Sequence, residues 1–464
     1  MRRMMTNSVF HPCRRLRGLA IVPLAILSGC HAKAPAAAPA VQIIVSGDTA
    51  GWIVPCGCTT KQLGGLPRRG AYVAAAGRPA EVVVADVGGA PGGTSPYDLH
   101  KFAAILRGEH LMDVAAHNIG AAEARLDAQV LVRLASEAGV PLVSANVRGP
   151  GGRHLVAPLR IVTAGGRKIA LTGVLSPSLA GRMAGVDPPR QAVLDALAAI
   201  SPRPDLVIVL AYLPTDELRE LTRQLPEADA VIGGPTGQSI PPERVGPTLL
   251  ASATNKGKFL VHLTADSSKP LRGTIAEMSD RWPDDARQIA NLDRYRASLA
   301  ERDFSAGDTS LALALPGTAA AGYRLAGTEA CRRCHADDHR VWKSSPHAHA
   351  WQTLAQRTAW ADPDCQQCHT TGYGLPGGFV SARRTPRLVD VGCESCHGPS
   401  AAHVAHPATH TAWFALAADR CVRCHDHENS PQFAYDSYWP RIEHGPAANS
   451  SGAAADDHSP ESKP

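Results

Sequence analysis

The chain has 464 residues, of which 44% are hydrophobic, so it is long enough for two or three domains with sizeable cores. Its formal net charge is +5, and the first 29 residues alone contribute +5, because they hold five arginines and no acidic residue. These arginines are Arg2, Arg3, Arg14, Arg15 and Arg17. Without that segment the formal charge is about zero, which gives no support to nucleic-acid binding, and we set this class aside.

The first 29 residues are typical of a bacterial signal peptide. Basic residues precede a short apolar run, Leu19–Leu27, which is too short for a permanent membrane-spanning helix. Leu27-Ser28-Gly29-Cys30 then resembles the lipobox of bacterial lipoproteins, which implies cleavage before Cys30 and lipid on its sulfur. An ordinary signal peptide with a chance cysteine is the alternative. We expect a membrane-anchored protein of the periplasm, at the outer membrane rather than the inner because His31 follows Cys30, or at the cell surface.

An Ala/Pro-rich tether over residues 30–40 precedes a region, residues 41–266, in which β-branched runs alternate with amphipathic helical patterns. The expected strands are Val41–Val45, Val82–Ala85, Pro141–Ala145, Ile169–Gly173, Leu206–Ala211, Ala230–Ile232 and Thr248–Ala251. Helical patterns such as Asp127–Ala138 and Pro189–Ile200 lie between them. This alternation predicts an α/β layered domain.

A cysteine pair, Cys56 and Cys58, follows the first expected strand within Pro55-Cys56-Gly57-Cys58. Because α/β folds place their sites at the carboxyl ends of strands, we interpret this pair as a redox candidate. It can close a small strained disulfide or offer thiolates to a soft metal. A structural disulfide or a passive loop is the alternative.

Residues 267–321 are expected to be a connector with one helix, about Asp284–Glu301, and residues 446–464 a disordered tail. Residues 322–445, between them, predict a mainly α-helical and loop domain with four CxxCH motifs. The motif cysteines are Cys331, Cys334, Cys365, Cys368, Cys393, Cys396, Cys421 and Cys424, and the histidines that follow them are His335, His369, His397 and His425.

Each CxxCH motif supplies two thiols for the vinyl groups of a haem and an adjacent histidine for its iron. Four motifs in so short a stretch predict four haem c groups that themselves form much of the core. Zinc ribbons also use paired CxxC units, but they need no histidine after every pair.

This region resembles the tetrahaem cytochromes of the c-554 type. The resemblance is carried by Trp342-Lys-Ser-Ser-Pro-His347-Ala-His349, by Cys393-Glu-Ser-Cys-His-Gly-Pro and by Ile442-Glu-His444-Gly. It implies that His347, His403 and His444 bind iron opposite the motif histidines, with His349 as the substitute for His347. A surface histidine near a haem propionate is the alternative role for each. Three such ligands for four irons would leave one iron five-coordinate.

The α/β region resembles the metallophosphoesterase domain of the 5′-nucleotidase family, through Val45-Ser-Gly-Asp48, Leu63-Gly-Gly-Leu-Pro-Arg-Arg69 and Val84-Ala-Asp86-Val-Gly-Gly89. The resemblance implies a layered sandwich with two metal ions held by carboxylates, an asparagine and histidines. Only Asp48 is kept among these ligands; the other ligand positions hold Ala50, Gly89, Ala121, Ala122, Tyr212, Pro235 and Gly237. We therefore expect the scaffold without phosphoesterase activity.

These features predict an exported, lipid-anchored electron carrier whose partner is a redox protein or a quinone-linked donor or acceptor. The first domain would then serve docking or thiol redox chemistry. The alternative is a multihaem oxidoreductase that acts on a small nitrogen or sulfur species, at a five-coordinate haem or at Cys56 and Cys58.

Overall fold

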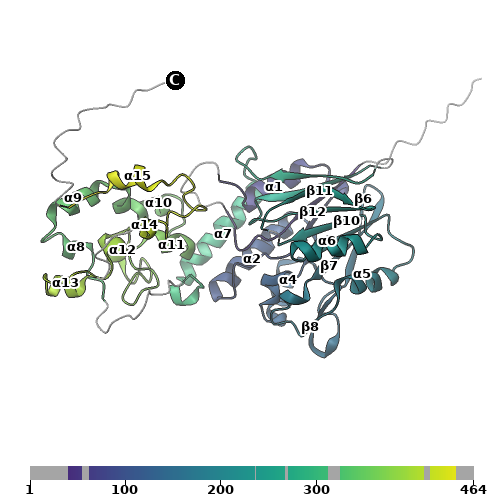
Figure 1. The fold of residues 1–464 in the computed structure, drawn as a ribbon, viewed down its shortest axis with the longest axis horizontal. Coiled ribbons are helices and arrows are strands. Elements are labelled where there is room, and N and C mark those ends of the chain that lie inside the picture. The colour runs from purple at the N-terminus through teal and green to yellow at the C-terminus, as the bar shows by residue number, and fades with distance from the viewer. Residues whose placement is uncertain are drawn as a thin grey trace, which may run out of the picture. The chain divides into compact units, whose positions relative to one another are not determined.

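The computed structural model describes residues 40–54, 62–235, 237–266, 270–311, 324–411 and 418–445. The signal segment with Cys30, the pair Cys56 and Cys58, and the C-terminal tail lie outside these residues. Within them, strands and helices are interspersed up to residue 302, and helices make up the named elements that follow, as Figure 1 shows. This distribution confirms the predicted fold class, an α/β layered domain followed by a helical one.

The first sheet has the strand order β14-β13-β1-β2-β3-β4. Its strands are β1 (Val41–Ser46), β2 (Val82–Asp86), β3 (Val114–Asn118), β4 (Leu142–Val143), β13 (Phe259–Ala265) and β14 (Arg272–Glu277). Strands β1 to β4 run parallel, and β13 and β14 add an antiparallel edge. The carboxyl ends of β1, β2 and β3 therefore meet at one edge of the sheet, where Ser46, Asp86 and Asn118 lie.

The second sheet has the order β11-β12-β10-β9-β7-β6. Its strands are β6 (Leu159–Ala164), β7 (Arg167–Leu175), β9 (Leu206–Tyr212), β10 (Ala230–Gly234), β11 (Ile240–Val245) and β12 (Thr248–Ser252). The four inner strands are parallel, and β6 and β11 pair antiparallel at the two edges. Every residue of β9 is buried, as expected for a parallel strand that is covered on both faces. A separate ribbon joins β5 (Val147–Arg148) to β8 (Gly185–Val186).

Helices cover the outer faces of the two sheets. They are α1 (Leu66–Ala75), α2 (Pro96–Leu111), α3 (Ala121–Ala124), α4 (Ala128–Ala138), α5 (Pro189–Ala198), α6 (Thr215–Gln224) and α7 (Ala286–Arg302). Helix α2 packs against α1, α4 and α7 over the first sheet, whereas α5 and α6 pack on the second. The largest apolar cluster takes side chains from both sheets, so they face each other in a four-layered sandwich.

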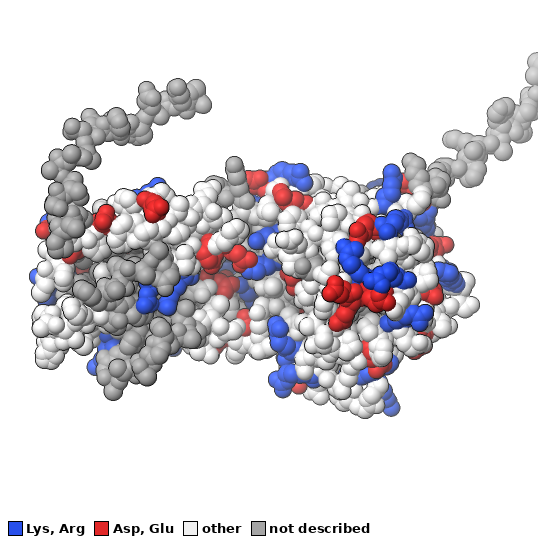
Figure 2. All heavy atoms as spheres, viewed as in Figure 1, with Lys and Arg blue, Asp and Glu red and all other residues white. Residues whose placement is uncertain are grey.

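Helix α6 shows how these outer helices are held. Its buried side chains include Leu218 and Leu221, while its outer face alternates acidic and basic residues. Figure 2 shows both signs of charge interspersed over this part of the surface. Exposed ion pairs such as Arg223 with Glu220 contribute little stability, so the leucines fix the helix to the sheet.

The α/β domain continues beyond residue 266, where the sequence analysis ended it. Strand β14 pairs with β13 along its length, and α7 buries Leu292, Tyr295 and Leu299 in the main core of the sandwich. The expected connector helix is thus part of this domain. The sequence did not show this because β14 is a half-exposed edge strand that lacks a continuous apolar run.

The C-terminal region is built from short helices, α8 (Thr328–Cys331), α9 (Ala336–Ser344), α10 (Ala350–Gln356), α11 (Pro363–His369), α12 (Cys393–His397), α13 (Ala401–Ala405), α14 (Ala418–Cys421) and α15 (Tyr435–Tyr438). Among the described residues, its apolar cluster joins Leu325, Tyr373, Phe379 and Leu388 to Ala306 of the preceding segment. No helix among the described residues combines the length and the apolarity that a membrane crossing requires.

Candidate haem-binding sites and a buried charge cluster

The CxxCH motifs lie on short helical turns. The second and third motifs fall within α11 and α12, and the first and fourth begin at the last residues of α8 and α14. In the first and fourth, the amide of the motif histidine donates to the carbonyl of the first cysteine, at 3.0 Å for His335 and 2.9 Å for His425. None of the eight motif cysteines, all of which lie among the described residues, forms a disulfide.

Three motif histidines each face one of the distal histidines expected from the sequence. The ring centroids are 6.1 Å apart for His335 and His403 and 5.8 Å apart for His397 and His444. The third pair is formed by His425 and His347, at 6.2 Å. An imidazole nitrogen binds a transition metal at about 2 Å, so two rings on opposite sides of one iron have centroids about 6 Å apart. The residues present therefore fit three irons with two histidine ligands each.

Hydrogen bonds fix the orientation of several of these rings. The Nδ1 atoms of His403, His444 and His369 lie 2.6, 2.7 and 2.8 Å from the carbonyl oxygens of Thr409, Ile442 and Ala350. A carbonyl only accepts, so each Nδ1 carries the proton and each Nε2 carries the lone pair that a metal binds. Burial lowers the pKa of His347, His397 and His425, which favours the neutral form that a metal requires.

Contacts between cysteine thiols show which motifs are neighbours. The Cys331 and Cys393 thiols share a hydrogen bond that raises the pKa of Cys331 and lowers that of Cys393. A similar bond from Cys368 lowers the pKa of Cys424. Cys396 lies near the Cys421 and Cys424 thiols, which add to the effect of burial in raising its pKa to about 11. The motifs therefore lie in the spatial order first, third, fourth, second.

In the α/β domain, Asp48 lies in the loop after β1 and its carboxylate is already hydrogen-bonded. It accepts from the hydroxyls of Tyr212, at 2.9 Å, and Thr254, at 3.1 Å. The Tyr212 ring fills the space beside it, since a Cβ atom at Gly89 or Gly120 would lie 2.7 or 2.8 Å from that ring. This packing supports the expectation that the metal centre of the resembled family is lost here.

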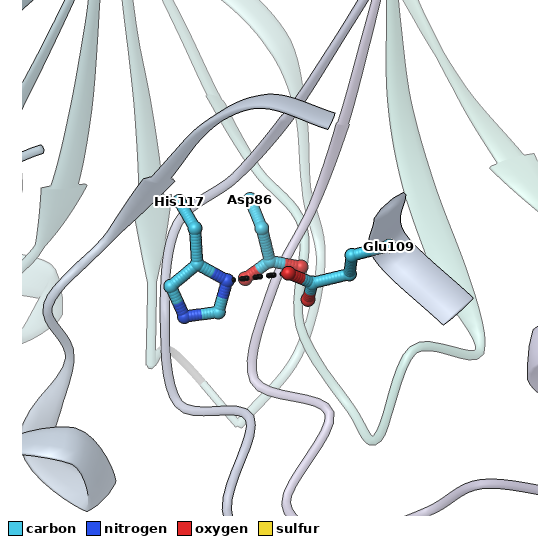
Figure 3. A group of neighbouring side chains, drawn as sticks. All are labelled: Asp86, Glu109 and His117. Carbon is cyan, nitrogen blue, oxygen red and sulfur yellow. Dashed lines mark hydrogen bonds and ion pairs between the residues drawn. The ribbon is translucent and has the colours of Figure 1, made fainter. Parts of the chain in front are cut away.

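A second buried cluster, which the sequence analysis missed, joins Asp86, Glu109 and His117. One atom from each lies within 4.8 Å of the others, and Figure 3 shows His117 and Glu109 facing each other beside Asp86. His117 lies 2.8 Å from Glu109 through Nδ1 and 3.2 Å from Glu123 through Nε2, with all three side chains fully buried. Both ring nitrogens of His117 therefore contact carboxylates.

Protein cations balance the carboxylates of this cluster. Burial alone lowers the pKa of His117, but the Glu109 carboxylate and the bonds to Glu109 and Glu123 outweigh it and raise the pKa well above 6.5. Asp86 accepts from the Ser46 hydroxyl at 2.5 Å and lies 3.6 Å from the buried guanidinium of Arg69. The arrangement is an internal ion network, for which the only signal in the sequence is a polar His-Asn pair at the end of an alanine-rich strand.

Comparisons with known proteins agree with the resemblance of the haem region to the c-554 type. Residues 330–398 match the family described as cytochrome c554 and c-prime. A cytochrome c-554 of Nitrosomonas europaea is 38% identical over 88 residues, which are 16% of this chain and 37% of that protein. The chain thus matches little more than a third of this curated relative, and the match supports covalently bound haem c.

Solved structures similar in fold include a 5′-nucleotidase precursor of Thermus thermophilus, with a TM-score of 0.48, 20% identity and coverage of 57% of this chain and 59% of that one. The sulfate thiohydrolase SoxB of Thermus thermophilus has a TM-score of 0.47 at 16% identity, covering 57% and 61%. The calcineurin-like phosphoesterase YfkN of Bacillus subtilis has a TM-score of 0.46 at 13% identity, covering 57% and 98%.

The charge cluster makes stability depend on pH. The pKa of His117 is raised in the folded state, so its protonation stabilises the fold fully below about pH 6.5 and this stability is lost as pH rises through the raised pKa. We expect amide exchange of β2 and β3 to show that the free energy of unfolding falls by at most about 1.4 kcal/mol per pH unit in that window. His117→Gln should abolish this slope; an equal slope in the variant would contradict the assignment.

The predicted resemblance of the haem region to the cytochrome c554 family is therefore confirmed over residues 330–398.

Proposed function

We propose that this chain is a tetrahaem c-type cytochrome that carries electrons. The observation that carries the proposal is the set of three histidine pairs at 5.8 to 6.2 Å, each joining a CxxCH histidine to a histidine distant in sequence. A haem with two histidine ligands is coordinatively saturated, which suits electron exchange rather than substrate binding. In this proposal His335 and His403 hold the first iron, His397 and His444 the third, and His425 and His347 the fourth.

The neighbour relations among the thiols support a continuous electron path. In the haem-loaded protein the cysteine sulfurs become thioethers, so motifs whose sulfurs approach each other bring their haems close together. Haem iron supplies one-electron exchange between its ferric and ferrous states when bound. We propose that electrons enter and leave through the ends of this series, at the first and the second motif.

The resemblance offers three distal histidines for four motifs, and on that basis we propose the second motif as the place of an iron with one histidine ligand. His347, His403 and His444 are each engaged with the histidine of another motif, and His349 is an exposed side chain. His369 is oriented through its Nδ1 contact with Ala350. This distribution favours a second candidate function, an oxidoreductase that binds a small nitrogen or sulfur species at this iron.

We further propose that the chain is exported and held to the periplasmic side of a membrane, preferably the outer membrane, by lipid on Cys30. The Ala/Pro tether after Cys30 would give the folded part freedom to meet a redox protein or a quinone-linked partner. The α/β domain, with Tyr212 packed beside Asp48, would serve as a scaffold rather than as a hydrolase.

The haem content tests the core of the proposal. The purified holoprotein should give four c-type haems per chain by the pyridine haemochrome method, because each motif offers both thiols. Changing Cys393 and Cys396 together to Ala should lower the value to three. A count of zero, or a count that this double change leaves at four, would contradict the proposal.

The distal ligands can be tested one at a time. His403→Ala should convert one haem from low-spin to high-spin, seen as a gain of about one high-spin centre per chain in the EPR spectrum of the oxidised protein, because the first iron loses its second histidine. His406→Ala is the matched control, since His406 is an exposed neighbour on the same segment. Equal spectra for the two variants would exclude His403 as a ligand.

A further inference from the structure

Helix α2 of the α/β domain contacts the segment that leads into the second haem motif. Tyr97 and Lys101 lie one turn apart on this helix, so their side chains are on the same face. The Tyr97 hydroxyl donates to Asp362 at 2.5 Å, and the Lys101 ammonium forms an ion pair with Asp364. Asp364 immediately precedes Cys365, the first cysteine of the motif.

The contact is well shielded from solvent on the α2 side. The side chain of Lys101 is 9% exposed, and Tyr97 is 1% exposed. Asp362 is the N-cap of α11, where its carboxylate accepts from the amide of Asp364 at 3.1 Å. The helix that carries the second motif is therefore anchored at its first residues by two side chains of another domain.

Lys101 is a fixed positive charge in this contact. Burial alone lowers its pKa, but the carboxylates of Asp364 and Asp362 and the thiol of Cys365 outweigh this effect, so that the pKa of Lys101 is raised. Burial raises the pKa of Asp362, which Lys101 opposes. The influence of Cys365 on Lys101 places the ammonium within electrostatic reach of the atom to which the haem would be attached.

We propose that Lys101 is a positioning residue for the second haem, through which the α/β domain orients the motif helix and raises the reduction potential of that haem. This inference depends on one part of the proposed function, namely that a haem is bound at Cys365 and Cys368. Reduction adds a negative charge to the haem, and a cation nearby in a medium of low dielectric favours the reduced form. A retained scaffold without hydrolase chemistry would thus have a role in setting the driving force of electron transfer.

A second ion pair between the same domains is expected to act more weakly. Lys256 pairs with Glu428, three residues after the histidine of the fourth motif, and the side chain of Lys256 is 31% exposed. Charges in contact with water are screened, so their effect on a potential is smaller than that of a buried charge. We therefore expect the buried Lys101 to change the reduction potential of a haem more than the partly exposed Lys256 does.

The test is a spectroelectrochemical titration of the full-length holoprotein. Lys101→Met should shift the potential of one haem to more negative values, because two carboxylates then lose their nearby cation. Lys101→Arg should restore a potential close to that of the unaltered protein. Lys343→Met removes an exposed lysine of the haem region and is the matched control, for which no comparable shift is expected.

A second variant covers the case in which Lys101→Met does not fold. Asp364→Asn removes one carboxylate and should move the same potential in the opposite direction, to more positive values. Unchanged potentials in Lys101→Met, or equal shifts in Lys101→Met and Lys343→Met, would overturn the inference, as would a negative shift in Asp364→Asn. The haem count of each variant is measured in parallel: a protein without haem would refute the proposed function itself, whereas four haems with unmoved potentials would refute the role of Lys101 alone.

Discussion

The C-terminal region has little apolar core of its own, and this constraint shapes the account of its function. The eight apolar residues that are buried among the described residues of this stretch, three of them alanines, cannot offset the conformational entropy of a chain that reaches from residue 324 to residue 445. Bonds between histidines and iron, together with the flat apolar surface of the haems, can replace the missing core. The paired imidazole rings lie at the spacing that such bonds require, so the same contacts would hold the fold and carry the electrons.

In the α/β domain, several acidic side chains are buried near the carboxyl ends of the strands, and each of them needs a partner. Asp86 and Glu123 lie beside the cations Arg69 and His117, burial raises the pKa of Glu109 and so favours its neutral form, and Asp48 accepts hydrogen bonds from two hydroxyl groups. A cluster of this kind is costly to break, since a partner removed from a buried ion network leaves a charge unpaired. The ion pairs of the network join side chains of β3, α2 and α3, and the same domain contacts the haem region through other residues.

Much of the architecture was predictable from sequence because its signals are local. The CxxCH motifs are recognised from the spacing of their two cysteines and the histidine. The apolar runs of β1, β2 and β9 predict strands of an α/β sandwich. Strand β3 was not predicted because four of its five residues, Ala115, Ala116, His117 and Asn118, are not β-branched. Strand β14 and helix α7 were assigned to a connector because their attachment to the core depends on contacts with segments far away in the chain.

The pairing of ligands could not be predicted for the same reason. His347 lies twelve residues after His335 of the first motif, yet its ring faces His425 of the fourth motif. The meeting of Glu109 with His117 likewise depends on helix α2 lying over the first sheet, and the approach of Asp86 depends on its register opposite His117. Sequence spacing identified the candidates, and tertiary packing decided their partners.

The most direct test of the account is the spin state of the four irons in the oxidised holoprotein, measured by EPR with quantified signals. Three histidine pairs for four motifs predict three low-spin centres and one high-spin centre per chain. Four low-spin centres would contradict the open position proposed for the second motif, and two or more high-spin centres would contradict the histidine pairs on which the account depends.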